Sequence, residues 1–91
     1  MKPIRAKILV LHGYNDPVTP QAELRTFEEE MDQRACDWQV HLYGSTLHAF
    51  ATPTAQDPTS GVLYNPVSAA RAWKEVGVFL EEVLGLSQVE K

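Results

Sequence analysis

The 91-residue sequence predicts an α/β fold in which two parallel strands alternate with two helices. Three patterns carry this prediction. A continuous aliphatic run at 8–11 indicates one strand, polar–apolar alternation at 37–43 indicates another, and helical stripes of apolar residues follow each of them, at 20–35 and 66–84. Two strands that are joined through a helix are parallel and have a right-handed crossover. The predicted order is therefore strand, helix, strand, helix.

The first strand is predicted from the run Ile8–Leu11, which ends at His12 and Gly13. An uninterrupted run of branched aliphatic residues is typical of a strand that is buried on both faces of a parallel sheet. Turn-forming residues follow at 13–17. We therefore expect the strand to end there and the chain to reverse.

The first helix is predicted over 20–35. Thr19 is expected to be its N-cap residue, with Pro20 at the first helical position. The apolar residues inside it recur at spacings of three and four, as on one face of a helix: Leu24, Phe27, Met31 and Ala35.

The second strand is predicted over Asp37–Tyr43, where Trp38, Val40 and Leu42 alternate with polar residues or tyrosine. This period of two indicates one buried face and one wetter face, as at or near the edge of a sheet. His41 is expected to face outward.

A long loop is predicted over 44–66, and its length favours a functional role. Asn65-Pro66 then begins the second helix, which Gly85 ends. Its apolar stripe is again spaced by three and four, and we expect the stripe to be core: Ala69, Trp73, Val76, Leu80 and Val83.

Two polar residues follow the predicted strands, Asp16 after the first and His48 after the second. Ligand groups gather beyond the carboxyl ends of parallel strands, so both residues are expected on the same rim of the sheet. A carboxylate there can accept from one imidazole nitrogen and leave the other free as a base. The alternatives are that Asp16 only caps a turn and that His48 is an ordinary loop histidine.

Several segments together resemble the dienelactone hydrolase family. Residues 9–17 and 27–31 resemble the segment around the family's catalytic acid, and 43–50 resembles the segment around its histidine. Residues 57–61 and 69–73 are also similar to family members. The resemblance implies a partial α/β-hydrolase fold, with 1–91 as one domain corresponding to the C-terminal part. It also implies ester or lactone hydrolysis, with Asp16 as the acid and His48 as the base of a triad.

The sequence contains no Gly-x-Ser-x-Gly or Gly-x-Cys-x-Gly, the pattern that carries the nucleophile in α/β-hydrolases. We therefore expect the chain not to be catalytic alone. Ser45 precedes His48 by three residues, but no strained elbow presents it as a nucleophile. Cys36 is expected at the opposite rim as a half-buried packing residue, and Trp38 is expected in the core.

Charge and composition exclude several other classes. The chain has 8 Lys and Arg against 12 Asp and Glu, a net charge of −4, so we expect no nucleic-acid partner. No segment is apolar enough for a signal peptide or a membrane span, and the single cysteine gives no sign of an oxidising compartment. We expect a cytoplasmic protein. His12 is expected to be structural, the three histidines lack metal-site spacing, and no cofactor is implied.

Three interpretations of function remain open. The first is a dienelactone-hydrolase-like fragment that retains the acid and base positions. The second is a non-enzymatic interaction module, in which the open edge of the first strand pairs with a second copy to extend the sheet in a homodimer. The third is one half of a split hydrolase, completed by an N-terminal partner chain.

Overall fold

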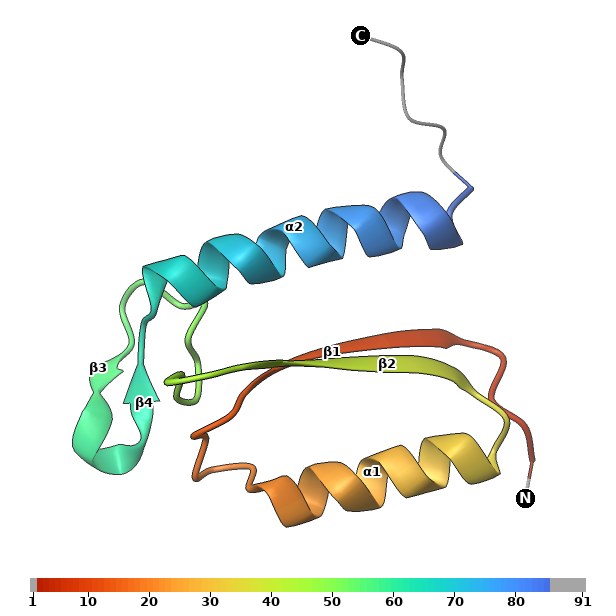
Figure 1. The fold of residues 1–91 in the computed structure, drawn as a ribbon, viewed down its shortest axis with the longest axis horizontal. Coiled ribbons are helices and arrows are strands. Elements are labelled where there is room, and N and C mark those ends of the chain that lie inside the picture. Colours follow the sequence, from red (N-terminus) through yellow and green to blue (C-terminus); the bar gives the residue numbers. More distant parts are fainter. Residues whose placement is uncertain (1, 86–91) are drawn as a thin grey trace, which may run out of the picture.

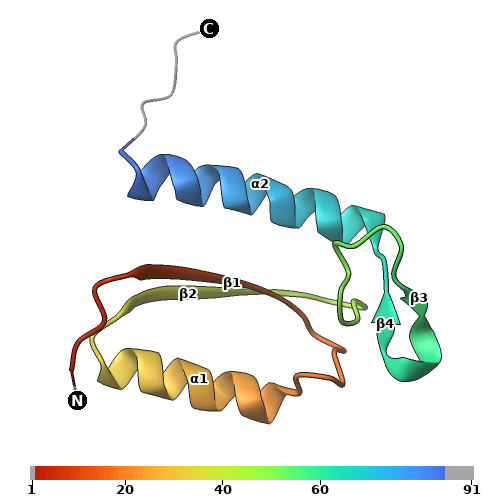
Figure 2. The ribbon, with the colours of Figure 1, turned by 180° about the vertical axis from the view of Figure 1, so that it is seen from behind.

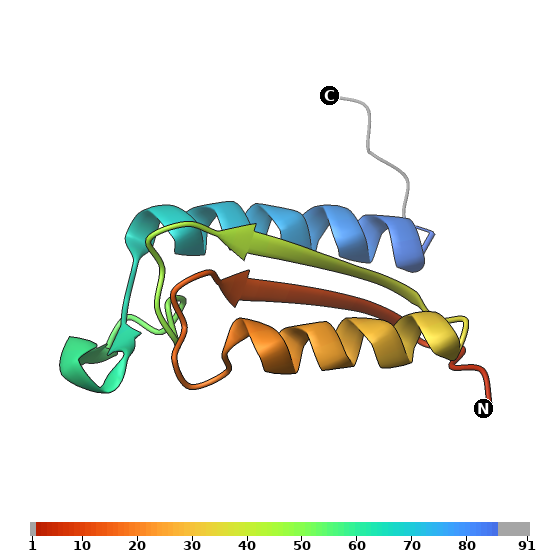
Figure 3. The ribbon, with the colours of Figure 1, turned by 60° about the horizontal axis from the view of Figure 1, so that its bottom comes forward.

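Two helices enclose a two-stranded parallel sheet in the computed structural model, which describes residues 2–85 (Figure 1). The strands are β1 (Lys7–Gly13) and β2 (Asp37–Tyr43), and the helices are α1 (Gln21–Gln33) and α2 (Pro66–Val83). The two helices lie on opposite faces of the sheet, and both strands run the same way (Figure 3). The predicted order of elements is therefore confirmed. Within the described range, no helix is long and apolar enough to cross a membrane.

The register of the sheet divides the residues of β2 between the two helices. Parallel pairing places Ile8 beside Trp38 and Leu11 beside His41. The Trp38 indole donates a hydrogen bond to Asp32 of α1 at 3.4 Å, whereas His41 Nδ1 lies 3.8 Å from a Glu75 oxygen of α2. Trp38 and His41 are both half-buried. His41 was expected to face outward, but it faces α2 instead of solvent, and Trp38, expected in the core, is only half-buried beside α1.

The aliphatic run of β1 is also less buried than its sequence predicts. Ile8–Leu11 are half-buried, not enclosed on both faces. Among residues 2–85, β1 is hydrogen-bonded to β2 alone, so its other edge is open. The fully buried apolar residues come instead from the helices and the long loop: Leu24, Met31, Phe50, Ala55, Ala69 and Ala72.

Helix α1 begins one residue later than predicted, because Thr19 does not cap it. Its N-cap residue is Pro20, in an extended conformation and without a side-chain cap. The Thr19 amide donates instead to the Asp16 carboxylate at 3.0 Å. Asp16 thus holds the turn in front of the helix. At the other end, Ala35 has a left-handed backbone (φ 53°), so the helix does not extend to this residue.

The segment 44–66 contains short regular elements in addition to loop. Strands β3 (Gln56–Asp57) and β4 (Val62–Leu63) pair antiparallel around a 3-10 turn, η1 (Pro58–Ser60). Figure 2 shows this unit beyond the carboxyl ends of β1 and β2. The His48 amide donates to the Gly61 carbonyl at 2.9 Å, and the His48 carbonyl accepts from Leu63 at 3.1 Å. The backbone of His48 is therefore held on both sides.

Helix α2 begins where the sequence predicts it, but two members of its apolar stripe, Trp73 and Leu80, are exposed. The Asn65 side chain accepts from the Ser68 amide at 3.0 Å, and Gly85 has a left-handed backbone (φ 68°) just after the helix. Ala69 and Ala72 occupy the buried positions, whereas Trp73 is 64% exposed. The expectation that Trp73 is core was wrong: the buried apolar positions of α2 are Ala69 and Ala72, which lies beside the predicted stripe.

Candidate active site

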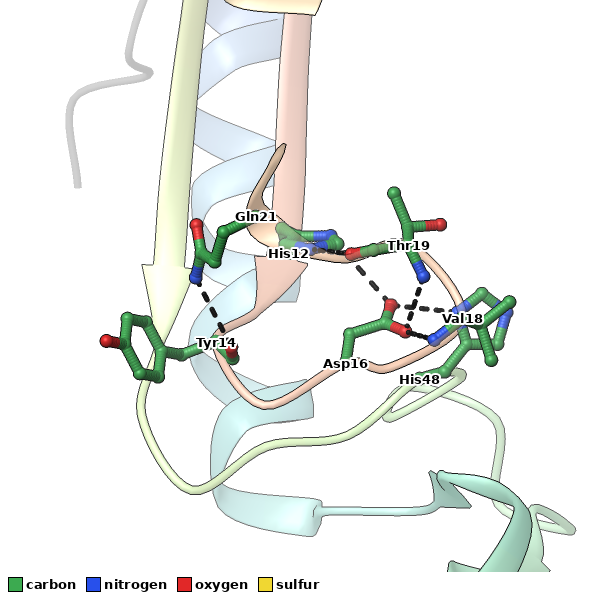
Figure 4. Close-up of polar contacts among 7 residues, drawn as sticks. All are labelled: His12, Tyr14, Asp16, Val18, Thr19, Gln21 and His48. Carbon is green, nitrogen blue, oxygen red and sulfur yellow. Dashed lines mark hydrogen bonds and ion pairs between the residues drawn. The ribbon is translucent and has the colours of Figure 1, made fainter. Parts of the chain in front are cut away.

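Asp16 and His48 meet at the carboxyl rim of the sheet (Figure 4). Asp16 comes three residues after the end of β1, and His48 comes five residues after the end of β2. His48 Nδ1 lies 2.9 Å from Asp16 Oδ2, across 32 residues of sequence. The predicted gathering of these two residues on one rim is thus confirmed. Their catalytic roles stay a prediction.

Asp16 is buried, at 7% exposed, and its carboxylate accepts several hydrogen bonds. Oδ1 accepts hydrogen bonds from the amides of Val18 at 2.8 Å and Thr19 at 3.0 Å (Figure 4). Burial alone would raise the pKa of Asp16, but the hydrogen bonds from Thr19, His48 and Val18 outweigh it and hold the pKa below its usual range. Asp16 is therefore a carboxylate at neutral pH.

The ionised Asp16 fixes the tautomer of His48. A carboxylate only accepts hydrogen bonds, so His48 Nδ1 carries the hydrogen of the 2.9 Å contact. The neutral imidazole then has an unprotonated Nε2. The His48 side chain is 42% exposed, while that of Asp16 is 5% exposed. One nitrogen is thus bound to a buried carboxylate and the other is available as a base, on a ring that is open to solvent.

His12 lies beside the pair, where the sequence predicted only a structural residue. It is buried, and its Nε2 lies 3.0 Å from the Thr19 carbonyl, which can only accept, so Nε2 carries the hydrogen. Its Nδ1 lies 3.9 Å from Asp16 Oδ2. His12 therefore fastens the turn whose amides bind Asp16. The sequence did hold one sign of this contact: His12 and Asp16 are four residues apart, on either side of the end of the first strand.

Two glycines allow the loops of the site to come close together. A side chain at Gly13 would place its first carbon 2.5 Å from the Thr46 carbonyl oxygen and 2.7 Å from that of Leu47. At Gly61 (φ 85°), the same atom would lie 2.1 Å from Pro17 Cγ. Both contacts join the segment that carries Asp16 to the segment that carries His48. Only glycine fits at such close approaches.

A buried hydroxyl joins the histidine loop to α2. Thr46 is 1% exposed, and its Oγ1 donates to the Gly44 carbonyl at 2.7 Å. The same oxygen lies 2.8 Å from Ser68 Oγ and accepts from the Asn65 amide at 3.3 Å. The Thr46 amide donates to the Asn15 side chain, next to Asp16. Thr46 thus connects both loops to the first turn of α2.

An aromatic pair supports the loop just beyond His48. The rings of Tyr43 and Phe50 are 5.6 Å apart and tilted by 45°, a favourable aromatic geometry. Burial and the negative charge of Glu75 raise the pKa of the Tyr43 phenol. Its oxygen has no hydrogen-bond partner among the described residues. Tyr43 therefore acts here through packing, as a neutral side chain.

A cleft of about 340 Å³ opens beside the pair, and Asp16 and His48 form part of its wall. The rest of the wall comes from the end of β1, the loop after His48 and the middle of α2. The exposed Trp73 is one of its lining residues. This cleft was not predicted, because residues from three distant parts of the sequence form it.

Comparisons with known proteins identify the family to which the chain belongs. The sequence matches the family model described as "Dienelactone hydrolase family" over residues 1–84. The chain belongs to this family. A solved structure with a TM-score of 0.78 and 28% sequence identity is described as a dienelactone hydrolase-like promiscuous phosphotriesterase from metagenomic libraries. The match covers 84% of this chain and only 32% of that one. A comparison with curated proteins finds no match.

This dienelactone hydrolase family member therefore has the predicted partial α/β-hydrolase fold. Two other candidate residues lie away from the pair. Cys36 is half-buried and donates to the Ala6 carbonyl at 3.4 Å, at the start of β2 and far from the rim, as predicted. No hydrogen bond among the described residues joins Ser45 to His48, and the Ser45 carbonyl accepts from Asn65. No group of three His, Cys, Asp or Glu in the described range is placed to hold a metal ion.

Proposed function

We propose that Asp16 and His48 are the acid and base of a hydrolase that acts on ester or lactone bonds. The observation that carries this proposal is the 2.9 Å contact between His48 Nδ1 and a buried Asp16 carboxylate. This contact leaves His48 Nε2 as the base of a triad. Membership of the dienelactone hydrolase family supports the reaction class.

The nucleophile, in this proposal, comes from polypeptide outside the 91 residues, as in the N-terminal part of a longer or split hydrolase. Nε2 takes the proton of a serine or cysteine as that residue attacks the ester carbonyl. The resulting imidazolium, stabilised by Asp16, gives the same proton to the leaving alkoxide. Water then hydrolyses the acyl-enzyme in the same way. In a serine hydrolase, loss of the nucleophile lowers kcat by about a million-fold.

The isolated chain tests the second part of this proposal. We expect no turnover of p-nitrophenyl acetate above the rate in buffer, while circular dichroism shows a folded protein. Hydrolysis that both Asp16→Asn and His48→Ala abolish would overturn the proposal that the chain is inactive alone.

A chimera tests the first part. Residues 2–85 replace the matched third of the metagenomic phosphotriesterase, and its hydrolysis of activated esters is measured. We expect an active chimera in which Asp16→Asn lowers kcat by about 10⁴, as loss of a triad acid does in serine proteases. His48→Ala should be equally damaging, whereas His41→Ala, which lies outside the cleft, should retain activity. A folded chimera that is indifferent to His48→Ala would refute the assignment.

A second candidate function is a homodimeric interaction module. The half-buried aliphatic run of β1 favours it, because β1 has no second neighbouring strand among the described residues. Pairing of β1 with its copy across a twofold axis would extend the sheet. Light scattering after size exclusion measures this directly. A folded monomer at micromolar concentration would refute the homodimer.

We also propose a cytoplasmic location, supported by the single cysteine, which cannot form a disulfide bond within these 91 residues. Fractionation of cells that express a tagged chain would place it in the cytoplasm. Recovery in a membrane or secreted fraction would contradict this.

A further inference from the structure

The cleft beside Asp16 and His48 has walls that are mainly apolar. Leu11 of β1, Phe50 of the histidine loop, and Ala72 and Val76 of α2 all line it. At about 340 Å³ it lies at the small end of the range for ligand sites in proteins. The walls therefore favour a small molecule whose surface is mostly apolar, because such a surface is easily desolvated.

The charges around the cleft are one-sided. None of the described residues that line it is Lys or Arg, its two histidines, His12 and His48, both lie beside Asp16, and Asp16 contributes a carboxylate. The hydrogen bonds that hold the pKa of Asp16 low keep that charge in place at neutral pH. An anionic group that entered the cleft would lose water without gaining an ion pair and would meet the negative charge of Asp16.

An aromatic side chain is available at the cleft for a flat ligand. Trp73 lines the cleft and is 64% exposed, a large apolar surface that its own chain leaves uncovered. An exposed aromatic ring next to small side chains such as Ala72 offers a stacking surface with room beside it. Both features favour a planar apolar group over a branched polar one.

We propose that this cleft binds the uncharged aromatic part of an ester substrate and rejects substrates that carry a carboxylate. This inference rests on the proposed function, since it places the ester carbonyl near His48. It goes further by naming the substrate class: neutral aryl or arylalkyl esters. The selectivity arises from the absence of Lys or Arg in the wall, so an added cation should reduce or remove it.

The test uses the isolated 91-residue chain and two probes of the same shape, phenylacetamide and phenylacetate. Both are titrated at pH 7 while ¹H–¹⁵N spectra are recorded. We expect phenylacetamide to shift the indole signal of Trp73 and the amides of Ala72 and Val76 at millimolar concentration. Phenylacetate should bind at least about tenfold more weakly, which corresponds to a difference of about 1.4 kcal/mol in binding free energy. The indole of Trp38, which lies outside this cleft, is the internal control.

A pair of matched variants tests the charge argument. Thr52 lines the cleft and is exposed, whereas Thr54 is exposed and outside it. Thr52→Lys should tighten phenylacetate about tenfold, and Thr54→Lys should change neither probe. Equal binding of both probes to the wild type, or no shift at Trp73 with either, would overturn the inference.

The outcome is separable from that of the chimera experiment. Selective binding of phenylacetamide to the isolated chain combined with an inactive, folded chimera would refute the proposed function and leave a neutral-ligand site. An active chimera whose isolated chain prefers phenylacetate would refute the substrate class alone.

Discussion

At the scale of single residues, Asp16 couples the site to the stability of the fold. Its pKa is lowered in the folded chain below the value of about 3.9 in an unfolded one. A group of this kind stabilises the fold above its unfolded pKa, and the contribution is lost as the pH falls through the folded pKa. Acid should therefore weaken the turn in front of α1 as well as the contact with His48.

Asp16→Asn should remove this dependence on pH. At pH 7 we expect the free energy of unfolding to fall by roughly 1–3 kcal/mol, the range for hydrogen bonds to a charged group. As the pH falls from the unfolded pKa through the lower folded pKa, the gap between the variant and the wild type should narrow, because the wild type then also becomes protonated. Urea unfolding followed by circular dichroism from pH 7 to pH 2.5 measures both effects. Parallel curves over the whole range would contradict this account of Asp16.

Gly13→Ala should separate the two loops of the site. The added carbon would lie 2.5 Å from the backbone carbonyl oxygen of Thr46. A backbone atom cannot move away by a side-chain rotation. We expect a loss of stability of about 1–3 kcal/mol, as for overpacking in a core, and a weaker His48 Nδ1 hydrogen bond to Asp16 in NMR spectra. Gly44→Ala is the matched control, because nothing lies within 4 Å of the carbon it adds. Equal effects of the two substitutions would rule out the close-approach explanation.

At the scale of elements, the two helices begin differently. Helix α1 follows Pro20 without a side-chain cap, whereas α2 is capped by Asn65, whose amide group also donates to Ser45 and Thr46. The cap of α2 is therefore part of the histidine loop. Loss of that cap should disturb the loop as well as the helix.

Asn65→Ala should destabilise the chain by about 1–2 kcal/mol, the upper range for loss of an N-cap. Because Asn65 also binds the histidine loop, amide exchange should quicken at 46–50 as well as in the first turn of α2. Val67→Ala, an exposed change in the same turn, controls for altered helix propensity. Faster exchange in α2 alone would show that the cap and the loop are independent.

The periodicity of apolar residues in the sequence identified the helices and strands, but it did not predict which of their side chains are buried. The stripe through Ala69 and Trp73 gave α2 correctly, but burial also depends on how far each side chain lies from the sheet, and Trp73 is exposed. The Thr19 cap was wrongly predicted because the helix begins one residue later, with Pro20 at the N-cap and its carbonyl accepting from the Glu23 and Leu24 amides. Asp16 and His48 were found because the rim of a parallel sheet follows from topology. The role of His12 and the existence of the cleft could not be predicted in this way. Both depend on contacts in the folded chain that the spacing of residues in the sequence does not reveal.

At the scale of the whole molecule, the sheet has two strands and few fully buried apolar side chains among residues 2–85. A small chain with a half-buried β1 is stabilised by whatever covers that strand. Association with a second copy makes the unfolding midpoint depend on protein concentration.

We therefore expect the midpoint of thermal unfolding to rise between 2 and 200 µM if the homodimer forms through β1. Leu63→Ser, an exposed change in β4 and away from that edge, should retain the same dependence. Calorimetry at several concentrations measures it. A constant midpoint would leave the split hydrolase as the better account of the open edge.

The open edge of β1 also has a consequence for the chain during synthesis and storage. Ile8–Leu11 is an aliphatic β-strand segment without proline or charge, the kind of segment that nucleates fibrils when it is left uncovered. Lys7 and Arg5, directly before it, are placed as gatekeepers that oppose stacking of identical strands by charge repulsion. We therefore expect high salt, which screens the charges of these two side chains, to favour fibril formation.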